Sequence, residues 1–481
     1  MNLYAIVLGI IVLTLLGVSL ARLGKVKTKA DYLVAGRSLP AFVLVFTLLS
    51  SWIGSGSLLG GAENAYRHGF GALWQAAGGW AGLLLIYFIA PRARKFAQFT
   101  IPDLLESRYN QTARLLGVVA VLFTYTAITS YQFIGGGDII HLIFPTISAT
   151  NGAYILAGFV IVFTAIAGMG SVAYMDVVIG MLATVTLIVA LPVLIHLAGG
   201  WSGIHAALPA THFQLFGEIK PITAAELFLP TCLLMLGNQS MYQKFFSAKT
   251  ERDATVAVGG WMVGTILLET VIVGVAVVGS ALFRSGEVAD HPREILAYTA
   301  THAFGGSALL SILGALLMGA IFAKVVSTAN NYLFSPATNL VNDVFVRYIR
   351  PEASNGEVLT VSRVMVVGLG VWALVQALHI KSVLAMSLYA YTIYSAALTP
   401  VILAAFFWRR ATAAGAVASI AAGTAVTVGW RYVAPHLPAV LAERDAILPA
   451  LVLSLLCLLG VSLATAAPTE AHLRPFETED R

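Results

Sequence analysis

One short stretch decides the fold: Ser50-Ser51-Trp52-Ile53-Gly54-Ser55-Gly56-Ser57. Glycine and serine interrupt an otherwise apolar run over about residues 40–62. Such a break frees backbone groups, which can line a cavity and bind an ion or a small molecule. A similar interruption occurs further along the chain, at Leu236-Gly237-Asn238-Gln239-Ser240. Small residues that only let helices pack closely would explain either break alone, but two breaks at corresponding places predict an inverted repeat with a binding site between its halves.

The composition indicates that most of this chain is embedded in lipid. Of its 481 residues 58% are hydrophobic and only 11% are charged, whereas soluble domains carry roughly a quarter charged residues. A soluble enzyme, a nucleic-acid-binding protein and a disordered scaffold are therefore excluded. The net charge of +5 is explained by basic loops on the cytoplasmic side of a membrane rather than by a polyanionic partner. The two cysteines lie in apolar segments, so neither a disulfide framework nor a cysteine metal site is expected.

The apolar runs predict an all-α integral membrane protein with 13 transmembrane helices, since each crossing needs about 20 apolar residues. Residues 1–466 form a single transmembrane domain with its core at about 40–408, and 467–481 form a short cytoplasmic tail. The predicted spans are 3–22, 40–62, 70–91, 113–143, 152–168, 174–199, 224–245, 256–283, 303–337, 359–379, 382–408, 412–434 and 446–466.

The loops predict the orientation, because short cytoplasmic loops are enriched in lysine and arginine. With the N-terminus outside and the C-terminus cytoplasmic, most of the 28 basic residues fall on the inner side. Lys324 belongs to neither side, because it lies inside the ninth span. The inner residues are Arg22, Lys25, Lys27, Lys29, Arg37, Arg92, Arg94, Lys95, Arg108, Arg114, Lys244, Lys249, Arg252, Arg347, Arg350, Arg363, Arg409, Arg410, Arg474 and Arg481.

The sequence contains no motif for nucleotide binding, catalysis or metal coordination. The chain has no GxxxxGK[ST] phosphate loop, so concentrative transport would use an ion gradient rather than ATP. No nucleophile-and-base motif or metal-ligand spacing occurs either. We therefore expect a transporter that is not an enzyme and has no cofactor, with a small-molecule solute, a coupling cation and the lipid bilayer as its partners.

A few ionisable residues lie within the apolar spans, where they are costly and usually functional. They are Glu63, Asp138, Asp176, Glu269 and Lys324. Lys324, Ser327 and Thr328 stand at i, i+3 and i+4, so an ammonium group and two hydroxyl groups share one helical face. A lysine there would find a carboxylate or lose its proton, unless it snorkels to the interface.

The chain resembles the sodium:solute symporters, which include proline, pantothenate, sialic acid and sugar cotransporters. The resemblance covers nearly the whole chain and rests on six motifs in order. They are Asp31-Tyr32-Leu33-Val34-Ala35-Gly36-Arg37-Ser38-Leu39-Pro40, Thr100-Ile101-Pro102-Asp103-Leu104-Leu105-Glu106-Ser107-Arg108-Tyr109, Gly168-Met169-Gly170-Ser171-Val172-Ala173-Tyr174-Met175-Asp176, Gln243-Lys244-Phe245-Phe246-Ser247-Ala248-Lys249, Val326-Ser327-Thr328-Ala329 and Phe407-Trp408-Arg409-Arg410-Ala411-Thr412-Ala413-Ala414-Gly415-Ala416.

The resemblance implies a LeuT-like five-plus-five inverted repeat, with helices 2–11 as the core and helices 2 and 7 broken. It also implies a Na+ site formed by backbone carbonyls at Ser50 and Ile53 and by the hydroxyls of Ser327 and Thr328. Uncharged oxygen ligands of this kind suit a hard monovalent cation that must also be released.

Lys324 departs from the family pattern, which has a small residue there, and some relatives use the aspartate matching Asp176 for a second sodium ion. Two alternatives follow. In one, a pair between Lys324 and Asp176 replaces a sodium ion, and transport is independent of Na+ or coupled to H+. In the other, Lys324 contributes only its backbone and the protein remains Na+-coupled. The family favours the second alternative.

The resemblance also suggests where a polar organic solute binds. The positions are Gly54, Ser57, Gln75, Asn238, Gln239 and Thr392, whereas Glu269 lies outside the family's usual site and receives no role. The expected activity is secondary active symport by alternating access in a bacterial plasma (inner) membrane. A facilitator would not need the ion site that Ser327 and Thr328 preserve, and a sensor would need an output domain. The sequence identifies neither the solute nor the oligomeric state.

Overall fold

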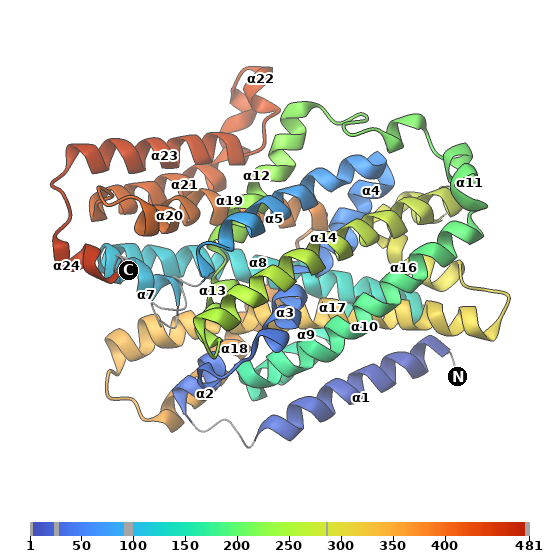
Figure 1. Cartoon of the computed structure of the whole chain (residues 1–481), viewed down its shortest axis with the longest axis horizontal. Coiled ribbons are helices and arrows are strands. Elements are labelled where there is room, and N and C mark those ends of the chain that lie inside the picture. The colour runs from blue at the N-terminus through green and yellow to red at the C-terminus, as the bar shows by residue number, and fades with distance from the viewer. Residues whose placement is uncertain (1–2, 24–27, 91–99, 285–286, 477–481) are drawn as a thin grey trace.

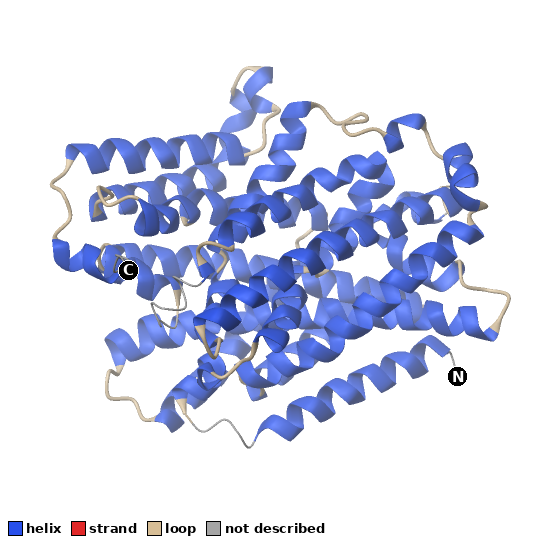
Figure 2. Cartoon of the chain, viewed as in Figure 1, coloured by secondary structure: helices blue, strands red, loops and turns tan. Residues whose placement is uncertain are grey.

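The protein is a bundle of helices, most of which lie side by side (Figure 1). A computed structural model describes residues 3–23, 28–90, 100–284 and 287–476. Within these ranges the elements are helices joined by turns, without a strand (Figure 2), so the all-α prediction is confirmed. Six basic residues of the predicted inner side lie outside the described residues: Lys25, Lys27, Arg92, Arg94, Lys95 and Arg481.

The described helices follow one another along the chain, joined by turns and short loops. The α-helices are α1 Leu3–Leu23, α2 Lys29–Val34, α3 Ala41–Trp52, α4 Ala62–His68, α5 Leu73–Ile86, α7 Ile101–Arg108, α8 Gln111–Ile143, α9 Ala149–Ile166, α10 Met169–Leu197, α11 Gly200–Ala207, α12 Pro221–Gly237, α13 Gln239–Ser247, α14 Glu251–Leu282, α15 Glu287–Asp290, α16 Ile295–His302, α17 Ala308–Asn339, α18 Asn355–Ala377, α19 Val383–Ala397, α20 Thr399–Phe407, α21 Ala413–Val433, α22 Ala439–Ala442, α23 Ile447–Ala464 and α24 Glu470–Leu473. The 3₁₀ and π segments are η1 Ala35–Arg37, η2 Gly56–Gly61, η3 Gly69–Ala72, η4 Ala210–Phe213, η5 Pro292–Glu294, η6 Leu340–Ile349, η7 Ala434–His436 and η8 Arg474–Phe476.

The helices are long enough to make this a multi-pass membrane protein. Eleven helical stretches of the described chain have the length and apolar character to cross a bilayer, and two shorter apolar helices cover Leu3–Val18 and Ala41–Trp52. Each predicted span overlaps a described helix. One stretch, Gly56–Ile86, contains parts of two predicted spans. The chain turns within this stretch at Gly69, which has a φ of +60°. The count of thirteen crossings stays a prediction.

The two predicted breaks are present. α3 ends at Trp52, and Ile53 is extended, with φ −85° and ψ 98°, before the helix resumes in η2. α12 ends at Gly237, and Asn238 is extended, with φ −61° and ψ 113°. The Asn238 side chain accepts a hydrogen bond from the Met241 N–H and so caps α13. Both breaks therefore follow from residues that favour turns and caps over a continuous helix.

α17 is enclosed by other helices, since it packs against α8, α10, α1 and α9. Its residues from Leu317 to Asn339 are all buried, so polar side chains on this helix meet protein rather than lipid. α21 and α23 pack against each other at the edge (Figure 1), where many of their side chains are exposed. Residues of α17 can therefore build a site, whereas α21 and α23 bound the bundle.

A charged cluster fastens α7 to α8 and to η6. Arg114 forms ion pairs with Asp103, Glu106 and Asp343, the last at 2.6 Å. Arg347 also pairs with Glu106, at 2.8 Å. Burial raises the pKa of Glu106, but the hydrogen bonds from both arginines outweigh this effect and hold the pKa below its usual range. The cluster joins two consecutive helices to η6, which lies far from both in the sequence.

We expect Arg114→Gln to destabilise the protein by about 3–5 kcal/mol, because it leaves the buried carboxylate of Asp343 without its cation. Arg347→Gln is the matched control, since it loses the shared partner Glu106 from a side chain that is 54% exposed rather than 5%, and it should cost about 0–1 kcal/mol. The measurement is thermal unfolding of the purified proteins. Equal losses in the two variants would contradict the assigned role of the cluster.

Candidate functional site

Oxygen atoms gather where the first helix break meets α17. The Thr328 hydroxyl donates to the Ser50 carbonyl at 2.9 Å and to the Ile53 carbonyl at 3.2 Å. The Ser327 hydroxyl lies 3.5 Å from the Ser50 carbonyl. All four residues are buried. The structure thus brings together the four residues that were predicted as Na+ ligands.

Gly54 allows the break to approach α17 this closely. A Cβ atom at Gly54 would lie 2.5–2.7 Å from three side-chain atoms of Thr328, which is closer than nonbonded atoms approach. Any larger residue would therefore push the break away from the hydroxyl. Gly54, predicted as a solute residue, instead lies against the proposed cation ligands.

Asp176, on α10, completes the polar cluster behind these oxygens. Its carboxylate accepts hydrogen bonds from the hydroxyls of Thr47 and Ser327 and from the Asn331 amide, the last at 3.1 Å. The carboxylate is fully buried, and neutral donors hold it in place. Ser327 therefore lies between the break and Asp176 and touches both.

The predicted direct pair between Lys324 and Asp176 is not formed. The Lys324 ammonium donates to the Ser50 hydroxyl at 3.3 Å, and this hydroxyl donates to the backbone carbonyl of Asp176 at 3.2 Å. No ion pair joins Lys324 to a carboxylate within the described residues. The direct pair, which belonged to one of the two alternatives, is thus absent in this conformation, where neutral donors bond to the carboxylate and the ammonium bonds to Ser50.

Lys244 is a second buried lysine, which the sequence placed among the inner-loop residues. It lies on α13 and is fully buried. Its ammonium donates to the Ser240 hydroxyl at 3.0 Å and to the side-chain amide oxygen of Asn331 at 2.9 Å. Asn331 therefore links Lys244 to Asp176. Its burial depends on how α13 packs against the rest of the bundle, which no local pattern in the sequence predicts.

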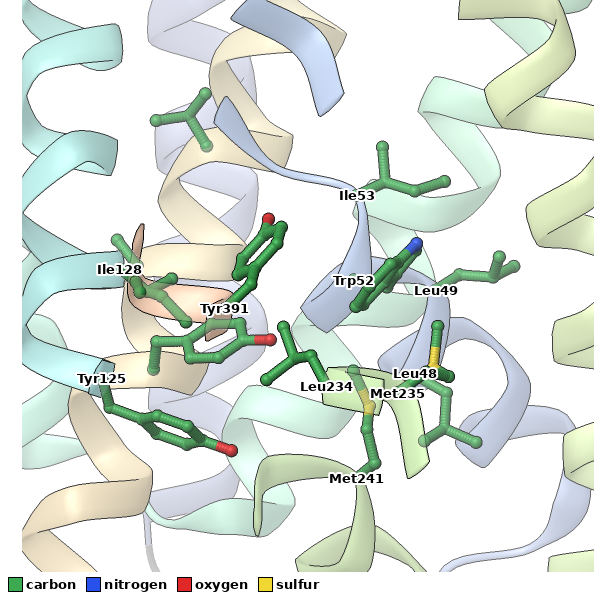
Figure 3. Packing of buried hydrophobic residues seen from close by; sticks show 14 of the residues in the cluster. Leu48, Leu49, Trp52, Ile53, Tyr125, Ile128, Leu234, Met235, Met241 and Tyr391 are labelled. Carbon is green, nitrogen blue, oxygen red and sulfur yellow. The ribbon is translucent and has the colours of Figure 1, made fainter. Parts of the chain in front are cut away.

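A small cavity of about 30 Å³ lies beside the break. Ser57 and Gln75, both predicted as solute residues, line it together with Trp52, Glu269 and Tyr391. The rings of Trp52 and Tyr391 are stacked, with centroids 6.3 Å apart. Figure 3 shows these two rings beside the point where the ribbon unwinds at Ile53. The cavity is thus built from both polar groups and aromatic faces.

Asn238 and Gln239 do not line this cavity. The Asn238 carbonyl oxygen accepts from the Tyr125 hydroxyl at 2.7 Å, and its amide donates to the Tyr332 hydroxyl at 2.9 Å. The Gln239 carbonyl oxygen accepts from the Ile101 N–H at 2.5 Å. In this conformation both side chains therefore hold the second break in place.

Thr392 is buried next to the cavity residue Tyr391, but it is not part of the cavity lining. Its hydroxyl has no hydrogen-bond partner among the residues that the structure describes. A buried hydroxyl of this kind usually has a partner, so Thr392 is free to bond to a molecule or a moved side chain that comes within reach.

Glu269 is the site residue to which the sequence assigned no role. It projects from α14 into the cavity and is buried. It accepts a hydrogen bond from the Trp52 indole at 2.8 Å and from the Trp80 indole at 3.0 Å, and the Ser57 hydroxyl lies 3.5 Å away. Its position inside an apolar span was the only signal in the sequence.

The chain is similar to known transporters. The model of the sodium:solute symporter family matches residues 32–423. The osmoregulated proline transporter OpuE of Bacillus subtilis is 25% identical over 93% of this chain and 92% of its own. The high-affinity proline transporter PutP of the same species is 26% identical over 93% of this chain and 95% of its own.

Solved structures share the fold. A Na+-coupled sialic acid symporter in a substrate-bound, outward-open state superposes with a TM-score of 0.81 at 15% identity, covering 97% of this chain and 98% of the other. Mhp1, a nucleobase-cation-symport-1 family transporter, superposes with a TM-score of 0.59 at 13% identity, covering 94% and 99%. The predicted LeuT-like fold with broken helices is confirmed.

We expect Gly54→Ala to destabilise the protein by about 1–3 kcal/mol, because the added Cβ overlaps Thr328. Gly158→Ala is the control, since a Cβ there meets nothing within 4 Å. Thermal unfolding of both variants is the measurement. A Gly54→Ala variant as stable as the wild type would show that the break does not depend on this approach.

Proposed function

The chain belongs to the sodium:solute symporter family, and we propose that it couples transport of a small polar organic solute to Na+ bound where the first helix break meets α17. A secondary active symporter of this kind is not an enzyme. We assign the Na+ ligands to the carbonyls of Ser50 and Ile53 and to the hydroxyls of Ser327 and Thr328. Their convergence within hydrogen-bond distance is the observation that carries this proposal.

The hydroxyl groups can form hydrogen bonds when the site is empty and coordinate the ion when it is bound. A threonine hydroxyl donates to the carbonyls when no ion is present, and by rotating it can present a lone pair to a cation instead. Neutral oxygens bind Na+ without the strong attraction of a carboxylate, so the ion can also leave. Because the break and α17 belong to different elements, bound Na+ would favour the conformation that holds them together.

The solute, we propose, binds in the cavity beside the break. Ser57 and Gln75 line it, and two similar proteins are named proline transporters. Gly54, Asn238, Gln239 and Thr392 lie elsewhere in this conformation, so contact between these residues and the solute stays a prediction. The break would move as the transporter alternates between outward and inward access.

Lys324 supports a second candidate of the same fold. Its ammonium touches the Ser50 side chain and so lies beside the proposed ion ligands. A permanent charge at this place could substitute for a cation, giving transport that is independent of Na+ or coupled to H+. In the primary proposal, Lys324 instead coexists with bound Na+.

We also propose a topology for the membrane-embedded chain. The basic loops favour an outside N-terminus and a cytoplasmic C-terminus. The similar proline transporters are bacterial, which suggests the bacterial plasma membrane. Lys244 no longer counts as a loop residue, but most of the basic residues still favour the same side.

We expect Thr328→Val to weaken Na+ binding by about tenfold or more, because it removes a ligand while keeping the side-chain shape. The measurement is the rise in melting temperature of the purified protein as NaCl replaces KCl. Thr427→Val is the control, since that hydroxyl bonds only within its own helix, to the Gly423 carbonyl. An unchanged Na+ response in Thr328→Val would contradict the assigned ligand.

Uptake into reconstituted vesicles tests the coupling, with Na+ and proton gradients imposed separately and L-proline as the first solute of a panel. We expect the wild type and Lys324→Ala both to require the Na+ gradient, because the ammonium does not replace the ion. Wild-type uptake without Na+, together with a new Na+ requirement in Lys324→Ala, would instead establish the second candidate.

A further inference from the structure

Glu269 differs from the other buried carboxylates of the bundle. Asp138 pairs with Arg293 at 3.0 Å, Glu226 with Arg444 at 3.5 Å, and Asp343 with Arg114 at 2.6 Å. Glu269 has no such partner among the described residues. A further buried carboxylate, that of Asp176, is linked to the ammonium of Lys244 through the side-chain amide of Asn331.

The neighbours of Glu269 favour its charged form. The indole groups of Trp52 and Trp80 donate to its two carboxylate oxygens, one to each, and an indole N–H can only donate. The third neighbour is the Ser57 hydroxyl. Neither indole can accept a proton from the carboxyl group, so these two hydrogen bonds suit the charged form. A negative charge in an apolar interior is costly unless a cation neutralises it.

The rest of the cavity offers what a cation requires. The Gln75 side chain is only 8% exposed, and its side-chain carbonyl oxygen has no hydrogen-bond partner in the part of the chain that the structure describes. It therefore presents a free acceptor from the same cavity wall. The stacked rings of Trp52 and Tyr391 add aromatic faces, which attract cations through their quadrupoles.

We propose that Glu269 is the residue that binds a positively charged nitrogen group of the transported solute. The carboxylate neutralises the charge, Gln75 accepts an N–H where the group has one, and the rings of Trp52 and Tyr391 enclose it. Trp52 and Trp80 act as positioning residues that fix the direction of the carboxylate. The inference rests on the proposed function in one respect, namely that this cavity holds the solute.

The position also links solute and ion. Trp52 donates to Glu269 and is the residue immediately before Ile53, whose carbonyl is a proposed Na+ ligand. A cation drawn to Glu269 thus binds beside the break that holds the ion. Solute and ion would favour the same arrangement of this segment.

Binding of matched pairs of compounds tests the proposal. The pairs are L-proline with tetrahydrofuran-2-carboxylate, and choline with 3,3-dimethylbutan-1-ol, in which oxygen or carbon replaces the charged nitrogen. Each compound is titrated onto the purified full-length protein in constant NaCl, and the dissociation constant is taken from the shift in melting temperature. We expect at least one compound with the charged nitrogen, the cationic member of its pair, to bind about tenfold or more tightly than the counterpart that lacks it.

Three variants separate recognition from folding. Glu269→Gln should remove the preference for the cationic member, whereas Glu269→Asp, which keeps the charge, should retain part of it. Glu226→Gln alters a buried carboxylate of another helix that has an arginine partner, so it should leave the preference unchanged. Melting temperatures without ligand report whether each variant is folded, and Glu269→Asp serves if Glu269→Gln does not fold.

Equal binding of the two members of every pair, including no binding of either, overturns the proposal. So does a cation preference that persists in Glu269→Gln, because the carboxylate would then have a purely structural role in holding the two indoles. The readout needs no ion gradient. Failure of Na+ coupling in vesicles would therefore leave a Glu269-dependent cation preference intact, and the two failures are distinguishable.

Discussion

Backbone polar groups within a bilayer must find their partners inside the protein, and the two helix breaks are where this constraint shapes the molecule. At the first break, side chains of α17 supply the partners, and Thr328 bonds to the carbonyls of both Ser50 and Ile53. At the second break, Asn238 caps the following helix. The breaks are thus maintained by polar side chains that protein surrounds on all sides.

The same partners make the first break suitable for an ion. A hydroxyl group that satisfies carbonyls can also join them in coordinating a cation, so the structural bond and the proposed binding site share atoms. Asp176 and Lys244 extend the polar network behind the site through Asn331. On the other side of the break, Trp52 connects it to the solute cavity through Glu269. One short segment therefore contacts both proposed sites.

The sequence was sufficient for features that depend on a single segment. Apolar length predicted the helices, glycine and serine predicted the breaks, and i, i+3, i+4 spacing placed Ser327 and Thr328 on one face. It failed where partners depend on how separate helices are rotated against each other. Lys324 reaches Ser50 rather than Asp176, and Lys244 is buried rather than exposed in a loop. The two indoles that orient Glu269 come from different helices, so no local sequence pattern predicts their contact with it.

Equilibrium binding of radiolabelled sodium to the purified wild-type protein tests the central claim most directly. The account predicts saturable binding that unlabelled Na+ displaces and K+ does not, because the carbonyls of the break and the hydroxyls of α17 form a site for one small cation. Absence of displaceable binding at any Na+ concentration would contradict it, since the oxygen cluster at the break would then serve the fold alone.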